Sequence, residues 1–190
     1  MFLTINEIRD IIAMTFVIGF IFSRFFRKEP SYSYDPLSYY SRQNTLINQI
    51  IYGAIIAAPA VVLHELSHKF VAMSFGANAI LHAPYKMYAI VILMVLLNFP
   101  IIFLVGGYVN ILTPLPPLPI AFVAVAGPLM NLILWFIFKS LIKYNIAPKK
   151  YWRELGMMAK LNLFLAGFNM LPIPGFDGFN FFQALFQTIL

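Results

Sequence analysis

Apolar residues occupy long uninterrupted stretches of this chain, and polar residues are gathered in short segments between them. The first apolar run covers Ile11–Phe22 and is closed by Arg24. Gln43–Leu63 has no charged residue, and its pattern predicts a helix that continues to about Phe75, where Gly76 is a typical stop signal. A bilayer core needs about 20 apolar residues per helix, so both stretches are candidates for membrane spans.

A later stretch of 52 residues, 87–138, contains no Asp, Glu, Lys, Arg or His and is long enough for two further spans. Glycines and prolines between 106 and 119 divide this stretch into Met87–Val105 and Ile120–Phe138. Because Pro100 interrupts the first part, that part either spans the membrane or is re-entrant. We expect Gly106–Ile111 to form a short extended strand.

The last apolar block, Leu161–Leu190, contains one charged residue, Asp177. Prolines and a glycine break the block at residues 171–175, which predicts a helix, an irregular segment and a final short helix. Together the patterns predict an all-α polytopic membrane protein. It would have about five to six transmembrane or re-entrant helices and a short β element near Gly106–Ile111.

Composition supports a membrane location. Hydrophobic residues make up 61% of the 190 residues and charged residues 11%, whereas soluble domains have about 25% charged residues. We therefore expect a multi-pass protein of the cell membrane, with the lipid bilayer as a partner. The absence of cysteine excludes disulfides, thiolate metal sites and a cysteine nucleophile.

The net charge of +6 comes largely from lysines and arginines in two connectors, Arg24–Arg42 and Lys139–Arg153. Such charge is typical of anchoring against anionic lipid and of a topology signal, and nothing in the sequence indicates a nucleic-acid partner. If Met87–Val105 is re-entrant, both connectors can lie on the same face of the membrane. If that segment spans, they lie on opposite faces.

The strongest chemical pattern is His64-Glu65-Leu66-Ser67-His68. On a helix, His64 and His68 are one turn apart and project from the same face, so they can share one metal ion. Glu65 follows the first ligand directly and is placed to act as a general base for water. The pattern is a hypothesis of zinc hydrolysis that still needs a third ligand.

The placement of the seven acidic residues points to that ligand. Only Glu65 and Asp177 lie inside apolar blocks, and the others fall in termini or connectors. A carboxylate at membrane depth costs several kcal/mol unless it is compensated. A divalent cation with two neutral histidines and two carboxylates sums to zero charge. The alternative is a protonated Asp177 together with a Glu65–Lys69 helical pair, which leaves the histidine spacing unexplained.

Two asparagines and a third histidine complete the set of polar candidates. Asn131 and Asn169 lie within apolar segments, where asparagine ordinarily forms hydrogen bonds between helices. His82 falls in the short connector Ala77–Lys86, and we do not assign it to the site.

The combined motifs resemble those of the site-2 protease family of intramembrane zinc metalloproteases. His64–His68 matches the zinc motif of that family, and Asn169–Gly178 matches its second signature, N-x-x-P-x-x-x-x-D-G. Ala126–Asn131 looks like the A-G-P-x-x-N element found between them. The three elements occur in family order. Phe176 stands where many members carry leucine.

The resemblance implies a zinc endopeptidase with one Zn²⁺ per chain. His64, His68 and Asp177 would bind zinc, and Glu65 would be the general base. Asn169, together with Asn131, would hold the substrate backbone or stabilise the oxyanion. The partner would be a transmembrane protein, cleaved in or near its transmembrane segment.

On this basis we expect residues 1–190 to form a single membrane-embedded metalloprotease domain. Residues 1–42 would supply an N-terminal span and an interfacial connector, and residues 43–190 the catalytic core.

Two other readings stay open. A membrane zinc protease could take its third ligand from a downstream glutamate, but the only one is Glu154, in a basic connector. A non-catalytic metal-binding protein or metal transporter could use the same ligands. A transporter would be expected to show further ionisable groups along a path.

Overall fold

The computed structural model describes residues 3–24, 46–99 and 106–189. Residues 25–42, which include the predicted interfacial connector, lie outside these ranges, as do residues 100–105 of the predicted Met87–Val105 block. The chain follows the order α1 (Ile5–Phe22), α3 (Leu46–Ser74), β1 (Ala79–His82), α4 (Tyr85–Leu96), β2 (Tyr108–Ile111), α5 (Pro117–Lys143), the 3-10 turn η1 (Lys149–Tyr151), α6 (Trp152–Asn169) and α7 (Asp177–Ile189).

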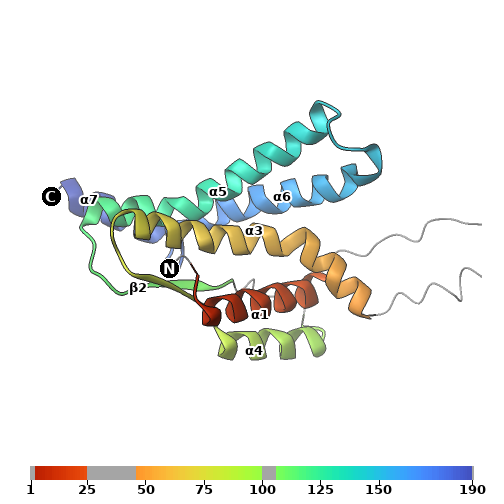
Figure 1. Cartoon of the computed structure of the whole chain (residues 1–190), viewed down its shortest axis with the longest axis horizontal. Helices are drawn as coiled ribbons and strands as arrows, with labels where there is room; N and C mark the ends of the chain where they lie inside the picture. Colours follow the sequence, from red (N-terminus) through yellow and green to blue (C-terminus); the bar gives the residue numbers. More distant parts are fainter. Residues whose placement is uncertain (1–2, 25–45, 100–105, 190) are drawn as a thin grey trace, which may run out of the picture.

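Three long helices form the centre of the molecule. α3 packs against α5 and α6, α1 covers another side of α3, and α7 packs on α5 (Figure 1). α3 ends near the predicted position, and Gly76 follows it with a positive φ of 81°. That backbone conformation is left-handed and favours glycine, so it confirms the predicted stop signal.

Two of the described helices, α3 and α5, are long and apolar enough to cross a membrane. The expected five to six spans are therefore not supported. α1 carries Glu7, Arg9 and Asp10 in its first turns, and α6 carries three charged residues along its length. α4 has 12 residues and α7 has 13, which is too short for a core that needs about 20.

The two strands form an antiparallel pair, so the fold is not purely helical. Ala79 lies opposite Ile111, and His82 lies opposite Tyr108. The strand expected at Gly106–Ile111 is confirmed as β2, whereas its partner β1 lies in the segment predicted to be a connector. The chain thus leaves the sheet after β1 and pairs with it again at β2, and α4 lies in the segment between the two strands.

Two acids near the N-terminus, Glu7 and Asp10, are buried in α1, with 1% and 3% of their surface exposed. Glu7 pairs with the buried ammonium of Lys69 and accepts a hydrogen bond of 2.9 Å from the Leu81 amide. Burial works to raise the pKa of Glu7, but these hydrogen bonds and those from Thr4 lower it to about 2. Glu7 therefore stays charged opposite Lys69.

Asp10 holds the segment after β1 in the same way. Its carboxylate accepts hydrogen bonds from the Ala83 amide at 3.1 Å and from the Tyr85 hydroxyl at 2.6 Å. The two carboxylates of α1 thus satisfy backbone donors on the edge of β1 that β2 does not cover. They fix the sheet to α1 and to the end of α3.

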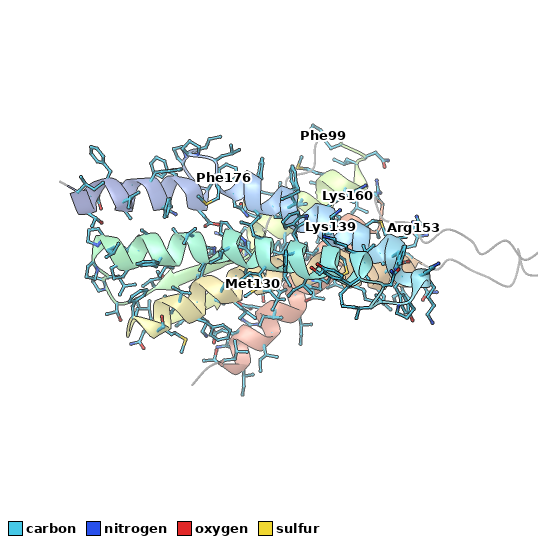
Figure 2. The ribbon with its side chains drawn as sticks, turned by 90° about the horizontal axis from the view of Figure 1, so that it is seen from above. Phe99, Met130, Lys139, Arg153, Lys160 and Phe176 are labelled. Carbon is cyan, nitrogen blue, oxygen red and sulfur yellow. The ribbon has the colours of Figure 1, made fainter. Side chains whose placement is uncertain are left out.

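The helix ends fall into two groups at opposite ends of the molecule. The C-terminal end of α1, the N-terminal end of α3 and the α5–α6 turn lie toward one end, and the sheet and α7 lie toward the other (Figure 1). Arg153 lies at the α5–α6 turn, far along the molecule from Phe176 (Figure 2). The described helix ends that border the two basic connectors therefore lie toward the same end of the molecule.

Candidate metal centre

Three predicted ligands meet between α3 and the start of α7. His64 Nε2 lies 3.1 Å from His68 Nε2, and Asp177 Oδ2 lies 3.0 Å from the first and 3.3 Å from the second. Tetrahedral zinc with ligand bonds of about 2.0–2.2 Å needs its ligand atoms about 3.3 Å apart. The donor set and its spacing therefore fit one zinc ion.

The local sequence explains how the ligands meet. The histidines are four residues apart on α3, so they share a face. Asp177 reaches them from the first turn of α7, after the irregular residues 170–176 have ended α6. The break predicted from prolines and glycine thus turns the chain so that Asp177 faces α3.

A glycine of α5 lies against the same atoms. A Cβ placed on Gly127 would lie 2.4 Å from His68 Nε2 and 2.6 Å from His64 Nε2. These distances are well below van der Waals contact, so any side chain here would fill the space between the ligands. Gly127 belongs to the Ala126–Asn131 element, but its role was missed because the motif does not indicate which atoms it faces.

The remaining ring nitrogens of both histidines are also engaged. His68 Nδ1 lies 2.7 Å from the Val123 carbonyl oxygen, which can only accept a hydrogen bond. His64 Nδ1 lies 2.6 Å from Asn131 Oδ1. With the proton on Nδ1, each histidine presents the lone pair of Nε2 to the metal, as is usual for histidine ligands.

Asn131 is 0% exposed and lies behind His64. Its amide group donates 2.9 Å hydrogen bonds to the Ala60 carbonyl and to Asn162 Oδ1. The observed contact of Asn131 is thus with a ligand, and its predicted contact with substrate stays a prediction. Asn162 was missed by sequence reasoning, because one more asparagine in an apolar helix has no distinguishing signal.

A cavity of about 800 Å³ opens beside the ligands. Glu65 and Asn169 line it together with residues of β2, α5, α6 and α7. Asn180 of α7 also lines it and was not singled out from the sequence. The cavity therefore brings together the ligands, the predicted base and the predicted oxyanion donor.

Glu65 is 9% exposed and lies beside the start of β2, where a Cβ on Gly106 would be 2.8 Å from its Oε1. The alternative Glu65–Lys69 pair does not form, since Lys69 is paired with Glu7. His82 lies 3.9 Å from Asp10 and is not among the cavity residues. Among the described residues, the one metal-binding group is His64, His68 and Asp177.

Comparison with known proteins gives two relatives in Methanocaldococcus jannaschii. The chain is 34% identical over 176 residues to "Putative zinc metalloprotease MJ0611", an alignment that covers 91% of this chain and 81% of that protein. It is 28% identical over 144 residues to "Zinc metalloprotease MJ0392", covering 74% of this chain and 37% of that protein. No protein-family model matches the chain.

Proposed function

Because the chain belongs to the family of zinc metalloproteases that includes MJ0611, we propose that it is an intramembrane endopeptidase of the site-2 protease kind. Its substrate would be a membrane protein, cut in or near a transmembrane segment. The observation that carries the proposal is the position of the metal ligands. Two of them belong to α3, a helix of 29 residues that is long and apolar enough to cross a bilayer.

The outer surface of the helix bundle supports a lipid environment for this site. Exposed large apolar side chains follow α3 at Ile47, Ile51 and Ile55, and α5 at Phe122, Leu129 and Phe136. Soluble proteins rarely expose contiguous apolar patches of more than a few hundred Å². Such helices are stable in hydrocarbon, because their apolar side chains contact lipid and their backbone hydrogen bonds lie within each helix.

Each residue of the site has a distinct part in the reaction. Zinc held by His64, His68 and Asp177 supplies a Lewis acid that makes water more acidic and polarises a carbonyl. The Glu65 carboxylate accepts a proton from the attacking water and delivers it to the nitrogen of the leaving amine. The Asn169 side-chain amide donates a hydrogen bond to the substrate carbonyl oxygen as negative charge develops on it.

The sheet suits an extended substrate. The backbone amide of Leu81 donates to Glu7 and therefore points away from β2. The backbone amide and carbonyl of its register partner Val109 must then point away from β1, because in an antiparallel pair directly opposed residues either both bond to each other or both point outward. Val109 also lines the cavity, so we expect its outward-pointing amide and carbonyl to pair with an unwound peptide.

The test uses the full chain in liposomes with a single-span substrate protein. Its matched control is the same protein without the span, which stays in solution. We expect zinc-dependent cleavage of the spanning protein. Mass spectrometry should map the cut to the span or its border. Cleavage of the soluble form alone would contradict a membrane substrate. Metal uptake into the liposomes without cleavage would support the transporter alternative.

A further inference from the structure

A chain of buried side-chain amides continues from the metal ligand His64 into α6. Asn131 Oδ1 lies 2.6 Å from His64 Nδ1, and Asn131 Nδ2 lies 2.9 Å from Asn162 Oδ1. Asn162 Nδ2 in turn lies 2.8 Å from the Met158 carbonyl oxygen. Both asparagines are 0% exposed. Asn162 therefore touches neither the ligand atoms nor the cavity, but only Asn131 lies between it and His64.

In this series of side-chain amides, the donor and the acceptor of each hydrogen bond can be assigned. The Met158 carbonyl can only accept, so Asn162 must direct its NH₂ group to Met158 and its oxygen to Asn131. Asn131 then donates to Asn162, and its second hydrogen goes to the Ala60 carbonyl at 2.9 Å. Both hydrogens of Asn131 are thus used, so its oxygen must accept from His64 Nδ1–H.

We propose that Asn162 is a positioning residue for the metal ligand His64. Acting through Asn131, it holds His64 in the tautomer that carries the proton on Nδ1 and fixes the plane of the ring. The Nε2 lone pair then faces Asp177 and His68 without reorientation. The proposal rests on the zinc site of the proposed function and assigns a residue outside that site to its affinity.

The two histidine ligands differ in how they are supported. His68 is held by a backbone carbonyl of α5, which no substitution removes. His64 is held by the Asn131 side chain of α5, which is held in turn by the Asn162 side chain of α6. Zinc affinity is therefore linked through His64 to the packing of α6 against α5, and not through His68.

The simplest competing explanation is that Asn162 only joins α5 to α6, as polar residues do in membrane helices. Loss of a hydrogen bond between helices would lower the stability of the metal-free protein without changing how zinc is held. Loss of an outer partner of a ligand typically weakens metal binding about 10–100-fold. Zinc affinity and the geometry of the metal site separate the two explanations.

The experiment measures zinc affinity by chelator competition on the purified full chain in detergent. The variant Asn162→Leu removes the acceptor for Asn131 at similar volume. Asn162→Asp, protonated in this buried position, keeps both an acceptor and a donor and serves as the rescue variant. Ala159→Val is the matched control, because Ala159 is 1% exposed on the same helix and has no part in the amide chain.

We expect Asn162→Leu to weaken zinc binding about 10–100-fold and to change the absorption spectrum of the Co²⁺-substituted protein. Asn162→Asp should stay within a few-fold of wild type, as should Ala159→Val at comparable loss of stability. If Asn162→Leu does not fold, Asn162→Ser, which is too short to reach Asn131, replaces it with the same expectation.

Wild-type zinc affinity and an unchanged Co²⁺ spectrum in a folded Asn162→Leu or Asn162→Ser protein would overturn the proposal. Equal weakening by Ala159→Val would overturn it as well. Failure to cleave a membrane substrate would contradict the proposed function but leave this measurement intact. The two failures are therefore distinguishable.

Discussion

Replacing Gly127 with alanine tests whether the space between the histidines belongs to the metal. The added methyl carbon would lie 2.4 Å from His68 Nε2 and 2.6 Å from His64 Nε2, whereas carbon contacts are favourable at about 3.5–4.0 Å. Both rings must then move by about 1 Å. Each ring is held at Nδ1, so the movement breaks the bonds to Val123 and to Asn131.

The expected result is a folded protein that does not retain zinc. Alanine in a helix is more stable than glycine by about 0.5–1 kcal/mol, and overpacking costs about 1–3 kcal/mol. The metal-free variant should thus be at most about 2.5 kcal/mol less stable than metal-free wild type. Its zinc content, measured after dialysis against a chelator, should fall far below one per chain.

A matched control is available in α6. A Cβ on Gly156 would have no heavy atom within 4 Å, so Gly156→Ala should gain about 0.5–1 kcal/mol and retain zinc. If Gly127→Ala bound zinc as tightly as wild type, the rings would not be held as described, and the assignment of this space to the metal would be wrong.

Three further predictions concern the buried ion pair, the sheet and the metal itself. Glu7→Gln should lower the free energy of unfolding in detergent by about 3–5 kcal/mol, because it leaves the Lys69 ammonium buried without its partner; a double variant with Lys69→Met should recover most of that loss, and an equally unstable double variant would argue against the pair. Tyr85→Phe should cost about 0.5–3 kcal/mol, because Asp10 loses its shortest hydrogen bond; an unchanged unfolding midpoint would show that this contact does not hold the segment after β1. Zinc at 100 times its dissociation constant should stabilise the wild type by about 2.7 kcal/mol over the metal-free protein; the same zinc should leave the melting temperature of His64→Ala unchanged, and a shift equal to that of wild type would place the metal elsewhere.

Local patterns predicted much of the fold and the ligands. The spacing of His64 and His68 determines their shared face on any helix, and an acid among apolar residues needs a compensating partner, which singled out Asp177. Gly76 and the break after Asn169 were predicted for the same reason, since glycine and proline restrict the backbone wherever they occur.

Contacts between distant segments could not be predicted in this way. Glu7 was grouped with the acids of termini and connectors, because its partners, Lys69 and Leu81, are more than 60 residues away. β1 has four residues, which is too short for an alternating pattern to stand out. The expected five to six spans are not supported, because among the described helices only α3 and α5 are long and apolar enough to cross a membrane.

Two of the residues that surround the ligands, Val123 and Gly127, were missed for a related reason. Gly127, Val123 and Asn131 are four residues apart on α5 and face the histidines together. One of the three acts through its backbone carbonyl and another through the absence of a side chain. Neither contribution has a residue type that indicates metal chemistry, so both became visible only once α5 was placed against α3.

The most direct test of the central claim compares wild type, Glu65→Gln and Asp177→Ala for bound zinc and for cleavage of a single-span protein in liposomes. Glu65→Gln should keep one zinc per chain and lose cleavage by about 10²–10⁴-fold, because it removes the base and leaves the ligands. Asp177→Ala should lose both zinc and cleavage. Full cleavage by Glu65→Gln, or zinc held at wild-type affinity by Asp177→Ala, would contradict the account.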